Sequence, residues 1–236
     1  EEAYIEDTRG NKICDFKRNN LHLVNYSISV NKKLSFEKLK KHIFYLKNKP
    51  NAIPYVTSYY KKNWGFCMSY NKFKKIDKKE KFNVVIKSEH FDGYLDYTEM
   101  LIKGQSSMEI LIVSYICHPS LANNELSGPL LIMALSRILK KSKYSVRLVL
   151  LPETIGAITY INKNFRRLKD KLIAGFNLSC VGDAGPFTLI SSLDGNTYAD
   201  KISKRILKRY RRFKELSFLE RGSNERQFGC QNLKLP

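Results

Sequence analysis

Three apolar runs of the sequence each stop just before a side chain that can bind a metal ion or transfer a proton. The runs are Ile110–Ile116, Ser145–Leu151 and Leu172–Val181, and the side chains that follow them are His118, Glu153 and Asp183. Each run is short and rich in apolar residues, which predicts an interior strand of a parallel sheet. Open α/β sheets place their sites at the carboxyl ends of the strands. We therefore expect these three side chains to converge on a common cleft.

The residue types favour metal chemistry. Imidazole nitrogen and carboxylate oxygen bind Zn²⁺, and catalytic zinc sites keep one coordination position open for water. The loop after His118 offers a further donor, Glu125 or Asn124. A carboxylate beside such a water can take its proton as the oxygen attacks a carbonyl carbon.

Each of these residues also has an ordinary structural explanation. A histidine can simply end a strand, and Glu153 precedes an expected helix, whose macrodipole favours a negative charge at that end. Asp183 suits a turn before residues 184–186. One such residue alone is explained in this way, whereas three at the ends of consecutive strands favour a functional site.

Helices are predicted between these strands. The expected helices are Leu126–Leu139, with Pro129 tolerated in its first turn, Ile155–Phe165 and Ala199–Tyr210, and a further strand is expected at Phe187–Ser191. Alternating strands and helices imply a largely parallel sheet with helices on its faces.

The part of the chain before residue 98 carries more strand signals. We expect a hairpin around Arg9–Asn11, strands at Leu21–Val30, Phe82–Lys87 and Gly93–Tyr97, and a helix over residues 36–48 with Ser35 as its N-cap. The aromatic segment Ile53–Tyr70 is either the core of a small lobe or a pocket wall, and we favour the core. Residues 1–20 and 98–236 are assigned to an α/β domain, and residues 21–97 to an inserted, smaller β-rich lobe.

The formal net charge of +20 raises the question of a nucleic-acid partner. The basic residues are spread along the chain, and lysine outnumbers arginine, the residue that contacts phosphate bidentately. The densest run, Lys201–Lys214, keeps apolar residues at helical spacing, which predicts an amphipathic helix packed on the domain. We expect a solvated basic surface and no nucleic-acid site.

Membrane and secretory signals are absent from the sequence, since no apolar run approaches the length of a membrane span and there is no signal peptide. The five cysteines are odd in number, have no close pair, and sit beside apolar or aromatic residues. This usage favours a reducing, cytoplasmic location. Because the sequence begins at Glu1 and ends just after an apolar–polar alternation, we expect it to be part of a longer chain.

Several motifs together resemble the zinc-dependent aminopeptidase superfamily, which includes bacterial leucyl aminopeptidases and glutaminyl cyclases. These are CHPSLANNELSG at Cys117–Gly128, PETIGA at Pro152–Ala157, and CVGD at Cys180–Asp183. With HLVNYS and IPYVTSYYKKNWGFC they resemble more closely the bacterial aminopeptidase-like proteins of that superfamily, over nearly the whole chain. The resemblance implies a three-layer αβα sandwich, phosphorylase/hydrolase-like, with a mostly parallel sheet and a small inserted lobe.

Carried over by motif, His118 matches the first metal-binding histidine and Glu153 the general base. The ligand aspartates and the second glutamate of the superfamily are replaced by Asn124, Ser179 and Thr154. Its last histidine ligand has no match in this sequence. A two-zinc site is therefore in doubt. We expect one ion, or a rearranged set of ligands from His118, Glu125 and Asp183, with Zn²⁺ or another divalent metal.

The segment SNERQ at Ser223–Gln227 resembles the Ser-Asp-His segment that lines the superfamily's pocket. Arg226 adds a guanidinium that can hold a substrate carboxylate bidentately. We expect Asn124, Glu225 and Arg226 to bind substrate, and the alternative is a solvated surface loop. The resulting hypothesis is a metal-dependent hydrolase of an amide bond, exopeptidase-like, acting on a small molecule or peptide. The alternative is a catalytically silent binding protein, and the oligomeric state stays open.

Overall fold

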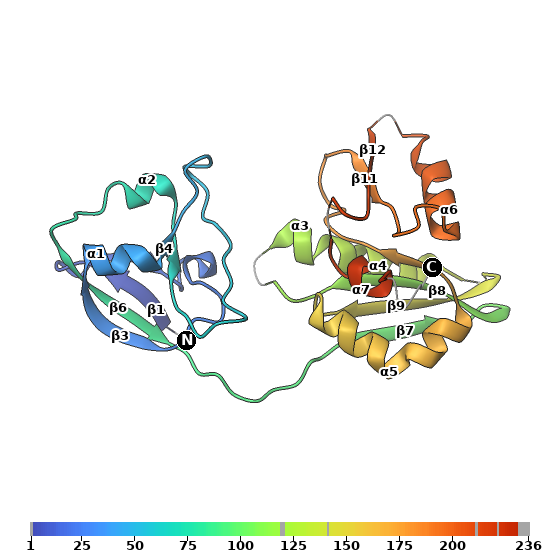
Figure 1. The fold of residues 1–236 in the computed structure, drawn as a ribbon, viewed down its shortest axis with the longest axis horizontal. Helices are drawn as coiled ribbons and strands as arrows, with labels where there is room; N and C mark the ends of the chain where they lie inside the picture. Colours follow the sequence, from blue (N-terminus) through green and yellow to red (C-terminus); the bar gives the residue numbers. More distant parts are fainter. Residues whose placement is uncertain (1, 119–120, 141, 211, 221, 231–236) are drawn as a thin grey trace. The chain divides into compact units, whose positions relative to one another are not determined.

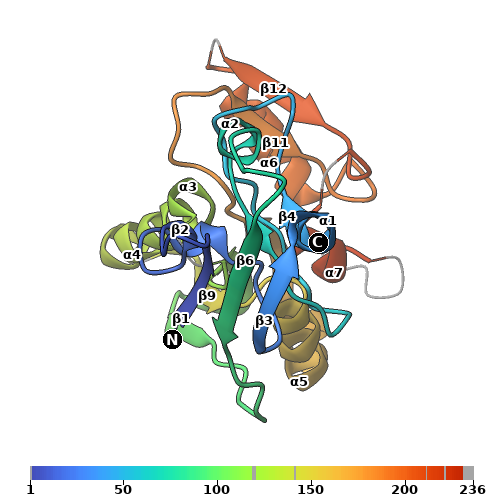
Figure 2. The ribbon, with the colours of Figure 1, turned by 90° about the vertical axis from the view of Figure 1, so that its left-hand side faces the viewer.

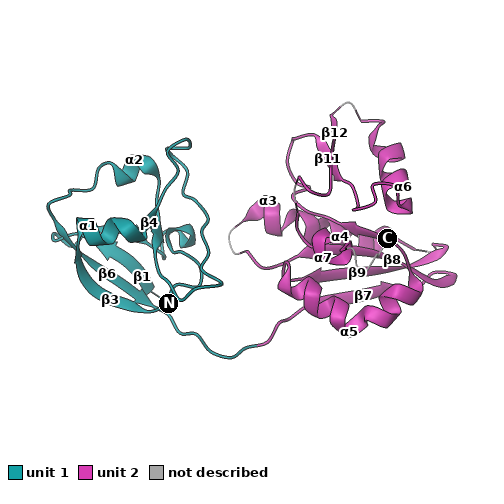
Figure 3. Ribbon diagram, in the orientation of Figure 1, with its two compact units in different colours: residues 1–93 teal, residues 94–236 magenta. Residues whose placement is uncertain are grey.

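Two compact units make up the chain, Glu1–Gly93 and Tyr94–Pro236 (Figure 3). The computed structural model describes residues 2–118, 121–140, 142–210, 212–220 and 222–230. Each unit has its own sheet and its own buried apolar cluster, and the elements of both are labelled in Figure 1.

The first unit is built on an antiparallel sheet with strand order β2-β1-β6-β3. The strands are β1 (Glu2–Glu6), β2 (Lys12–Asp15), β3 (Val30–Ser35) and β6 (Lys81–Lys87). Figure 2 shows β6 between β1 and β3. The predicted hairpin is present, and its turn is held by Asp7, whose carboxylate accepts the backbone N–H groups of Arg9 and Asn11. The side-chain amide of Asn11 also donates to this carboxylate, and that bond, followed by the backbone bonds, lowers the pKa of Asp7.

The N-terminal residues belong to this first sheet. Residues 1–20 were assigned to the α/β domain, but β1 pairs along its whole length with β6. The reason is that Ala3 and Ile5 of β1 point into the same core as Phe82 and Val84 of β6. The aromatic segment contributes Trp64 and Phe66 to this core, as the core interpretation predicted.

Other expectations for this unit are wrong in detail. The helix expected over residues 36–48 is only α1 (Phe36–Leu39), followed by η2 (Lys40–His42) and β4 (Ile43–Phe44). Strand β4 pairs instead with β5 (Phe66–Cys67) because this register buries Ile43 against the aromatic core. The stretch expected as strand Leu21–Val30 is mostly loop after η1 (Asn20–His22), and α2 (Tyr70–Phe73) closes the aromatic segment.

The second unit contains a four-stranded sheet of order β10-β8-β9-β7. The strands are β7 (Thr98–Ile102), β8 (Ser106–Tyr115), β9 (Tyr144–Leu151) and β10 (Leu172–Asn177). Strands β10, β8 and β9 are parallel, and β7 is an antiparallel edge strand in place of the strand expected at Gly93–Tyr97. The register sets Tyr115 opposite Leu151, so β8 and β9 end at the same level.

Helices α5 (Ile155–Lys171) and α4 (Ser127–Ile138) pack on opposite faces of this sheet, because alternate strand residues point to opposite sides. Leu111, Val113, Val149 and Leu151 share a buried cluster with α5. Val146 and Leu148 share another with Ile132 of α4. Helix α4 approaches closely at Gly128, where a Cβ would lie 2.1 Å from Ser114 Oγ and 2.6 Å from the carbonyl oxygen of Leu178.

The remaining elements follow β10. A separate two-stranded parallel sheet joins β11 (Phe187–Ile190) to β12 (Phe213–Leu216), and α6 (Tyr198–Leu207) lies between them in sequence. A capping box of Thr197 and Asp200 starts α6. Burial acts to raise the pKa of Asp200, but hydrogen bonds from Ser192 and Thr197 outweigh it and lower the pKa. The basic helix ends before Tyr210 and leaves Ile206 47% exposed, so its apolar face is less covered than predicted. No helix of the described residues is long and apolar enough to span a membrane.

A buried ion network ties together the strands of the second unit away from their carboxyl ends. Arg147 of β9 donates two hydrogen bonds to Glu109 of β8, at 2.6 and 2.7 Å, and one to Glu99 of β7 at 2.6 Å. Arg167 of α5 adds a bond of 3.0 Å to Glu109. Burial acts to raise the pKa of Glu109, but the two guanidinium groups outweigh it and hold the pKa below its usual value.

We predict that Arg147→Met lowers the free energy of unfolding by about 3–5 kcal/mol, because it leaves the buried carboxylate of Glu109 without its main partner. Urea denaturation of the wild type and the variant measures the change. Arg9→Met is the matched control, since the Arg9 side chain is 74% exposed in its pair with Asp7 and the change costs about 1 kcal/mol or less. Equal losses in the two variants would contradict the assigned role of the buried network.

Candidate active site

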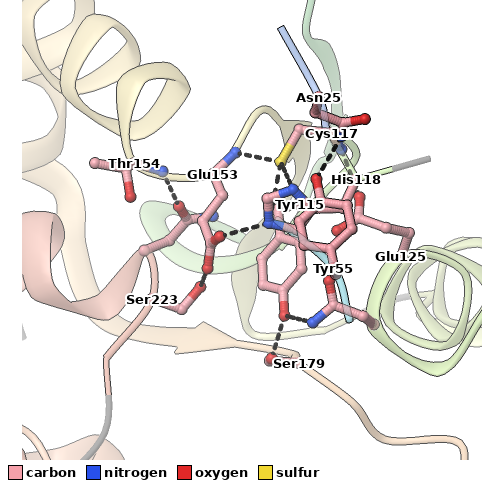
Figure 4. A network of polar contacts seen from close by, with 12 residues as sticks. Asn25, Tyr55, Tyr115, Cys117, His118, Glu125, Glu153, Thr154, Ser179 and Ser223 are labelled. Carbon is pink, nitrogen blue, oxygen red and sulfur yellow. Dashed lines mark hydrogen bonds and ion pairs between the residues drawn. The ribbon is translucent and has the colours of Figure 1, made fainter. Parts of the chain in front are cut away.

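An imidazole and a carboxylate meet at the carboxyl ends of β8 and β9. His118 Nε2 lies 2.9 Å from Glu153 Oε2, and Ser223 Oγ donates to Glu153 Oε1 at 2.5 Å (Figure 4). Both side chains are partly accessible, His118 at 16% and Glu153 at 24%. The common end of the two strands thus brings together two residues that are distant in sequence.

A strained turn directs Glu153 toward His118. Thr154 has φ 62° and ψ −72°, and the N–H of Ile155 donates to the carbonyl oxygen of Glu153 at 2.7 Å. This is a γ-turn of the rare kind with positive φ, in a β-branched residue for which such a conformation is unfavourable. Asn224 holds the turn from the other side, because its Oδ1 accepts the N–H of Thr154 at 2.9 Å. Strain of this type is concentrated at functional sites.

A second group of donors surrounds His118. Ligand atoms of Cys117, His118 and Glu125 all lie within 4.8 Å of one another. Glu125 is only 8% exposed, and its Oε2 accepts the backbone N–H of Cys117 at 2.5 Å. Its Oε1 is buried and has no hydrogen-bond partner among the described residues. A buried acceptor without a partner is costly unless a proton or a cation satisfies it.

Cys117 lies in this group, although the sequence did not mark it as a candidate ligand. All five cysteines are expected from the sequence to be buried free thiols because each has apolar or aromatic neighbours, but Cys117 directly precedes His118. Cys117 Sγ also accepts the backbone N–H of Glu153 at 3.2 Å. Burial raises the pKa of this thiol to about 11, against the opposing effect of that hydrogen bond. The only sign in the sequence that Cys117 could be a ligand is its position directly before His118.

Asp183 does not join this group. Strand β10 ends at Asn177, four residues earlier than predicted, so Asp183 lies in a loop. Its carboxylate is exposed and accepts Asn123 Nδ2 at 2.8 Å and the backbone N–H of Gly185 at 2.6 Å. Of the three expected side chains, the structure pairs His118 with Glu153 and leaves Asp183 in a turn of its own.

Neutral groups are hydrogen-bonded to each other beside the donor group. Asn124 Nδ2 donates to Tyr115 Oη at 3.0 Å, and Tyr115 Oη lies 2.5 Å from Ser179 Oγ. Burial is the main cause that raises the pKa of Tyr115, so the phenol stays neutral. Asn124 and Ser179 are the positions where the resemblance led us to look for acidic ligands. Neutral amide, phenol and hydroxyl groups leave no charge there to hold a second divalent ion.

The segment around α7 (Glu225–Phe228) lies next to the γ-turn, because Ser223 and Asn224 just before it contact Glu153 and Thr154. Glu225 accepts Asn177 Nδ2 and the backbone N–H of Ser223, both at 2.6 Å, so its carboxylate holds the loop together. Arg226 donates to the carbonyl oxygen of Leu219 at 3.1 Å, and its guanidinium lies 5.2 Å from the ring centre of Phe218. Arg226 also lines a hollow of about 990 Å³ with residues of α5, including Lys163 and Arg166.

A smaller hollow of about 510 Å³ contains the donor group itself. Its lining residues are Ile116, Cys117, His118, Leu121, Ala122, Glu125 and Leu126. Both hollows are within the range of small-molecule sites. The smaller one combines apolar walls with a few convergent ligand atoms.

Comparison with known proteins places the chain in a family. The sequence matches the family described as "Domain of unknown function (DUF4910)" over residues 8–236. The chain belongs to the DUF4910 family. A Clostridium acetobutylicum protein named "Putative polysaccharide biosynthesis protein with aminopeptidase-like domain" is 40% identical over 238 residues, which is 100% of this chain and 54% of that protein. The DUF4910 chain thus spans about half the length of this curated relative.

Solved structures share the fold of the DUF4910 chain. The crystal structure of a "putative peptidase" from Clostridium acetobutylicum has a TM-score of 0.92 and 39% identity, over 100% of this chain and 56% of that one. The zinc aminopeptidase BSAP from Bacillus subtilis has a TM-score of 0.62 at 13% identity, over 90% of this chain and 65% of that one. At that identity the second likeness shows the fold alone, which is an aminopeptidase-like α/β fold.

We predict that Asn224→Ala lowers the free energy of unfolding by about 1–3 kcal/mol, because it removes the fully buried acceptor of the half-buried N–H of Thr154. Thermal or urea denaturation measures the loss. The control is Asn162→Ala at an exposed position of α5, with an expected change within about 0.5 kcal/mol. A loss no larger than that of the control would mean that Asn224 does not hold the turn.

Proposed function

We propose that the protein containing this chain is a metal-dependent hydrolase of amide bonds that acts in an exopeptidase-like manner on peptides or small amides. The observation that carries the proposal is the hydrogen-bonded pair of His118 and Glu153 beside the unpartnered oxygen of Glu125. The aminopeptidase and peptidase names of the relatives support peptide hydrolysis. Because the chain spans about half of its curated relative, the proposal concerns the whole protein.

The residues fit one divalent ion better than two. His118 and Glu125 would hold it, since an imidazole nitrogen and a buried carboxylate oxygen without a partner are suitable donors. The neutral cluster of Asn124, Tyr115 and Ser179 does not fit a second ion. A bound Zn²⁺ or similar ion supplies an acidified water and polarises the substrate carbonyl. Asp183 is not needed in this arrangement.

Glu153 is the proposed general base. Its Oε1 and Oε2 lie between Ser223 and His118, which hold the carboxylate in one orientation. The carboxylate takes the proton of the attacking water and passes it to the leaving amine. Ser223 orients the carboxylate by donating a hydrogen bond to it, and Asn224 keeps the backbone turn that presents Glu153. Leu121 and Leu126 give the hollow that contains His118 an apolar wall.

Substrate binding is proposed for the α7 segment and for Asn124, whose buried Oδ1 has no partner among the described residues. Arg226 is the proposed partner of an anionic group, in a basic hollow shared with Lys163 and Arg166. Glu225 contributes by orienting this segment through its bonds to Asn177 and Ser223.

A catalytically silent binding protein is the second candidate. The neutral cluster of Asn124, Tyr115 and Ser179 favours it, because these groups cannot replace acidic metal ligands. A silent binding protein would bind a peptide or amide in the hollow that contains His118 and would not hydrolyse it.

We predict that Glu153→Gln lowers kcat about 10²–10⁴-fold in the full-length protein, with its metal content unchanged, because the amide cannot accept the proton of the water. Steady-state hydrolysis of aminoacyl-amide substrates and elemental analysis measure the two quantities. Glu89→Gln, at an exposed position, is the control and should leave both unchanged. Turnover unaffected by Glu153→Gln would remove Glu153 as the base. No turnover in the metal-loaded wild type would favour the silent protein.

We predict that Arg226→Ala raises KM about tenfold for an anionic substrate and leaves kcat nearly unchanged, because a charge-assisted contact in the ground state is lost. The comparison of an anionic with a neutral substrate of the same size measures this effect. Arg205→Ala on the exposed face of α6 is the control for net charge. A KM equal to that of the wild type for both substrates would contradict a role in binding.

A further inference from the structure

The thiol of Cys117 and the imidazole of His118 lie close enough together to reach one metal ion after a change of side-chain orientation. The distances from Cys117 Sγ to the ring nitrogens of His118 are 3.7 Å to Nδ1 and 3.9 Å to Nε2. A zinc ion binds sulfur at about 2.3 Å and imidazole nitrogen at about 2.0–2.1 Å in a tetrahedral arrangement, which separates the two donors by about 3.6 Å. The sulfur is nearly equidistant from the two ring nitrogens and so does not lie along the lone pair of either one, and the imidazole has to turn before both donors bind the same ion.

The hydrogen bond to Glu153 determines which ring nitrogen is the donor. An ionised carboxylate can only accept, so His118 Nε2 carries the hydrogen in its 2.9 Å contact with Glu153. Nδ1 then carries the lone pair, and Nδ1 is the nitrogen nearer to Cys117 Sγ. A carboxylate behind the ring of a metal-binding histidine is the usual arrangement that fixes the tautomer.

Glu125 provides an independent indication of a ligand at this position. Only 8% of the surface of Glu125 is exposed, and its Oε1 has no partner among the described residues. Its other oxygen is bound to the N–H of Cys117, which fixes the carboxylate next to the thiol and the imidazole. One ligand atom from each of Cys117, His118 and Glu125 lies within 4.8 Å of the other two.

We propose that Cys117 is a thiolate ligand, together with His118 and Glu125, of a single metal ion. Three protein donors leave the fourth tetrahedral position open, as catalytic zinc sites require. On binding, the metal–sulfur bond replaces the S–H bond, and the proton is released to solvent without any change of oxidation state. A soft sulfur donor selects Zn²⁺ and Co²⁺ over Mg²⁺, Ca²⁺ and Mn²⁺. The inference rests on the proposed function only in that both require a bound metal.

Cobalt(II) is the probe that tests this ligand set, because a cobalt–thiolate bond gives an intense charge-transfer absorption in the near ultraviolet. Metal-free full-length protein is titrated with Co²⁺ alone. We expect the band to saturate at one equivalent, to be absent in Cys117→Ser, and to remain in Cys180→Ser, whose half-buried thiol is the matched control. Zn²⁺ should displace Co²⁺, and Mg²⁺ should not. Zinc affinity should fall at least about 100-fold in Cys117→Ser.

Alkylation of the wild type gives a second readout that does not depend on the folding of a variant. Bound Zn²⁺ should protect Cys117 from iodoacetamide, as measured by peptide mass mapping, whereas Mg²⁺ should not. Stoichiometric Co²⁺ binding without the band, or a band that persists in Cys117→Ser, would overturn the thiolate ligand and leave the proposed hydrolase intact. A Cys117-dependent band in a protein that hydrolyses no amide would support the ligand set and contradict the hydrolase. Absence of metal binding would overturn both.

Discussion

The parallel pairing of β8 with β9 is the constraint on which the candidate site depends. The register places Tyr115 opposite Leu151, and the N–H of Ile116 continues the ladder to the carbonyl oxygen of Leu151 at 3.1 Å. His118 and Glu153 therefore emerge at the same level and meet. A shift by one residue would exchange the two faces of β8. Its apolar side chains would then point away from the clusters that they form with α4 and α5. The packing that stabilises the sheet is thus also what aligns the imidazole with the carboxylate.

The backbone next to the site is held in an unfavourable conformation by its surroundings. The positive φ of Thr154 costs on the order of 1–3 kcal/mol. The side chain of Asn224, fully buried, offsets part of this cost by accepting the N–H of the strained residue. Ser223, the residue before it, donates to the carboxylate of Glu153. A segment that is distant in sequence therefore holds both the turn and the carboxylate of the proposed base in place.

Much of the second unit was predictable because its strands are short apolar runs with polar stops. Strands β8 and β9 and helix α4 begin and end within a few residues of their expected bounds. The meeting of Glu153 with His118 could be expected because each follows such a strand. Asp183 was misplaced because β10 stops at Asn177, and nothing in the apolar run to Val181 shows that its last residues leave the sheet.

Long-range contacts explain what was missed. The N-terminal strand joins β6, more than seventy residues later, because burial of Ala3 and Ile5 decides its partner and local pattern does not. The helix after Ser35 ends early because Ile43 is more favourably buried beside Phe66. Cys117 was overlooked for a similar reason, since its contact with Glu125 joins residues eight apart and local pattern does not show it.

Metal content coupled to turnover tests the central claim most directly. Full-length protein is freed of metal with a chelator, its hydrolysis of aminoacyl amides is measured, and Zn²⁺ is then added back in known amounts. The account predicts that hydrolysis disappears with the metal and returns in proportion to bound zinc, up to one ion per chain. Hydrolysis that persists at full rate in protein shown to be metal-free, or a saturation at two ions per chain, would contradict it.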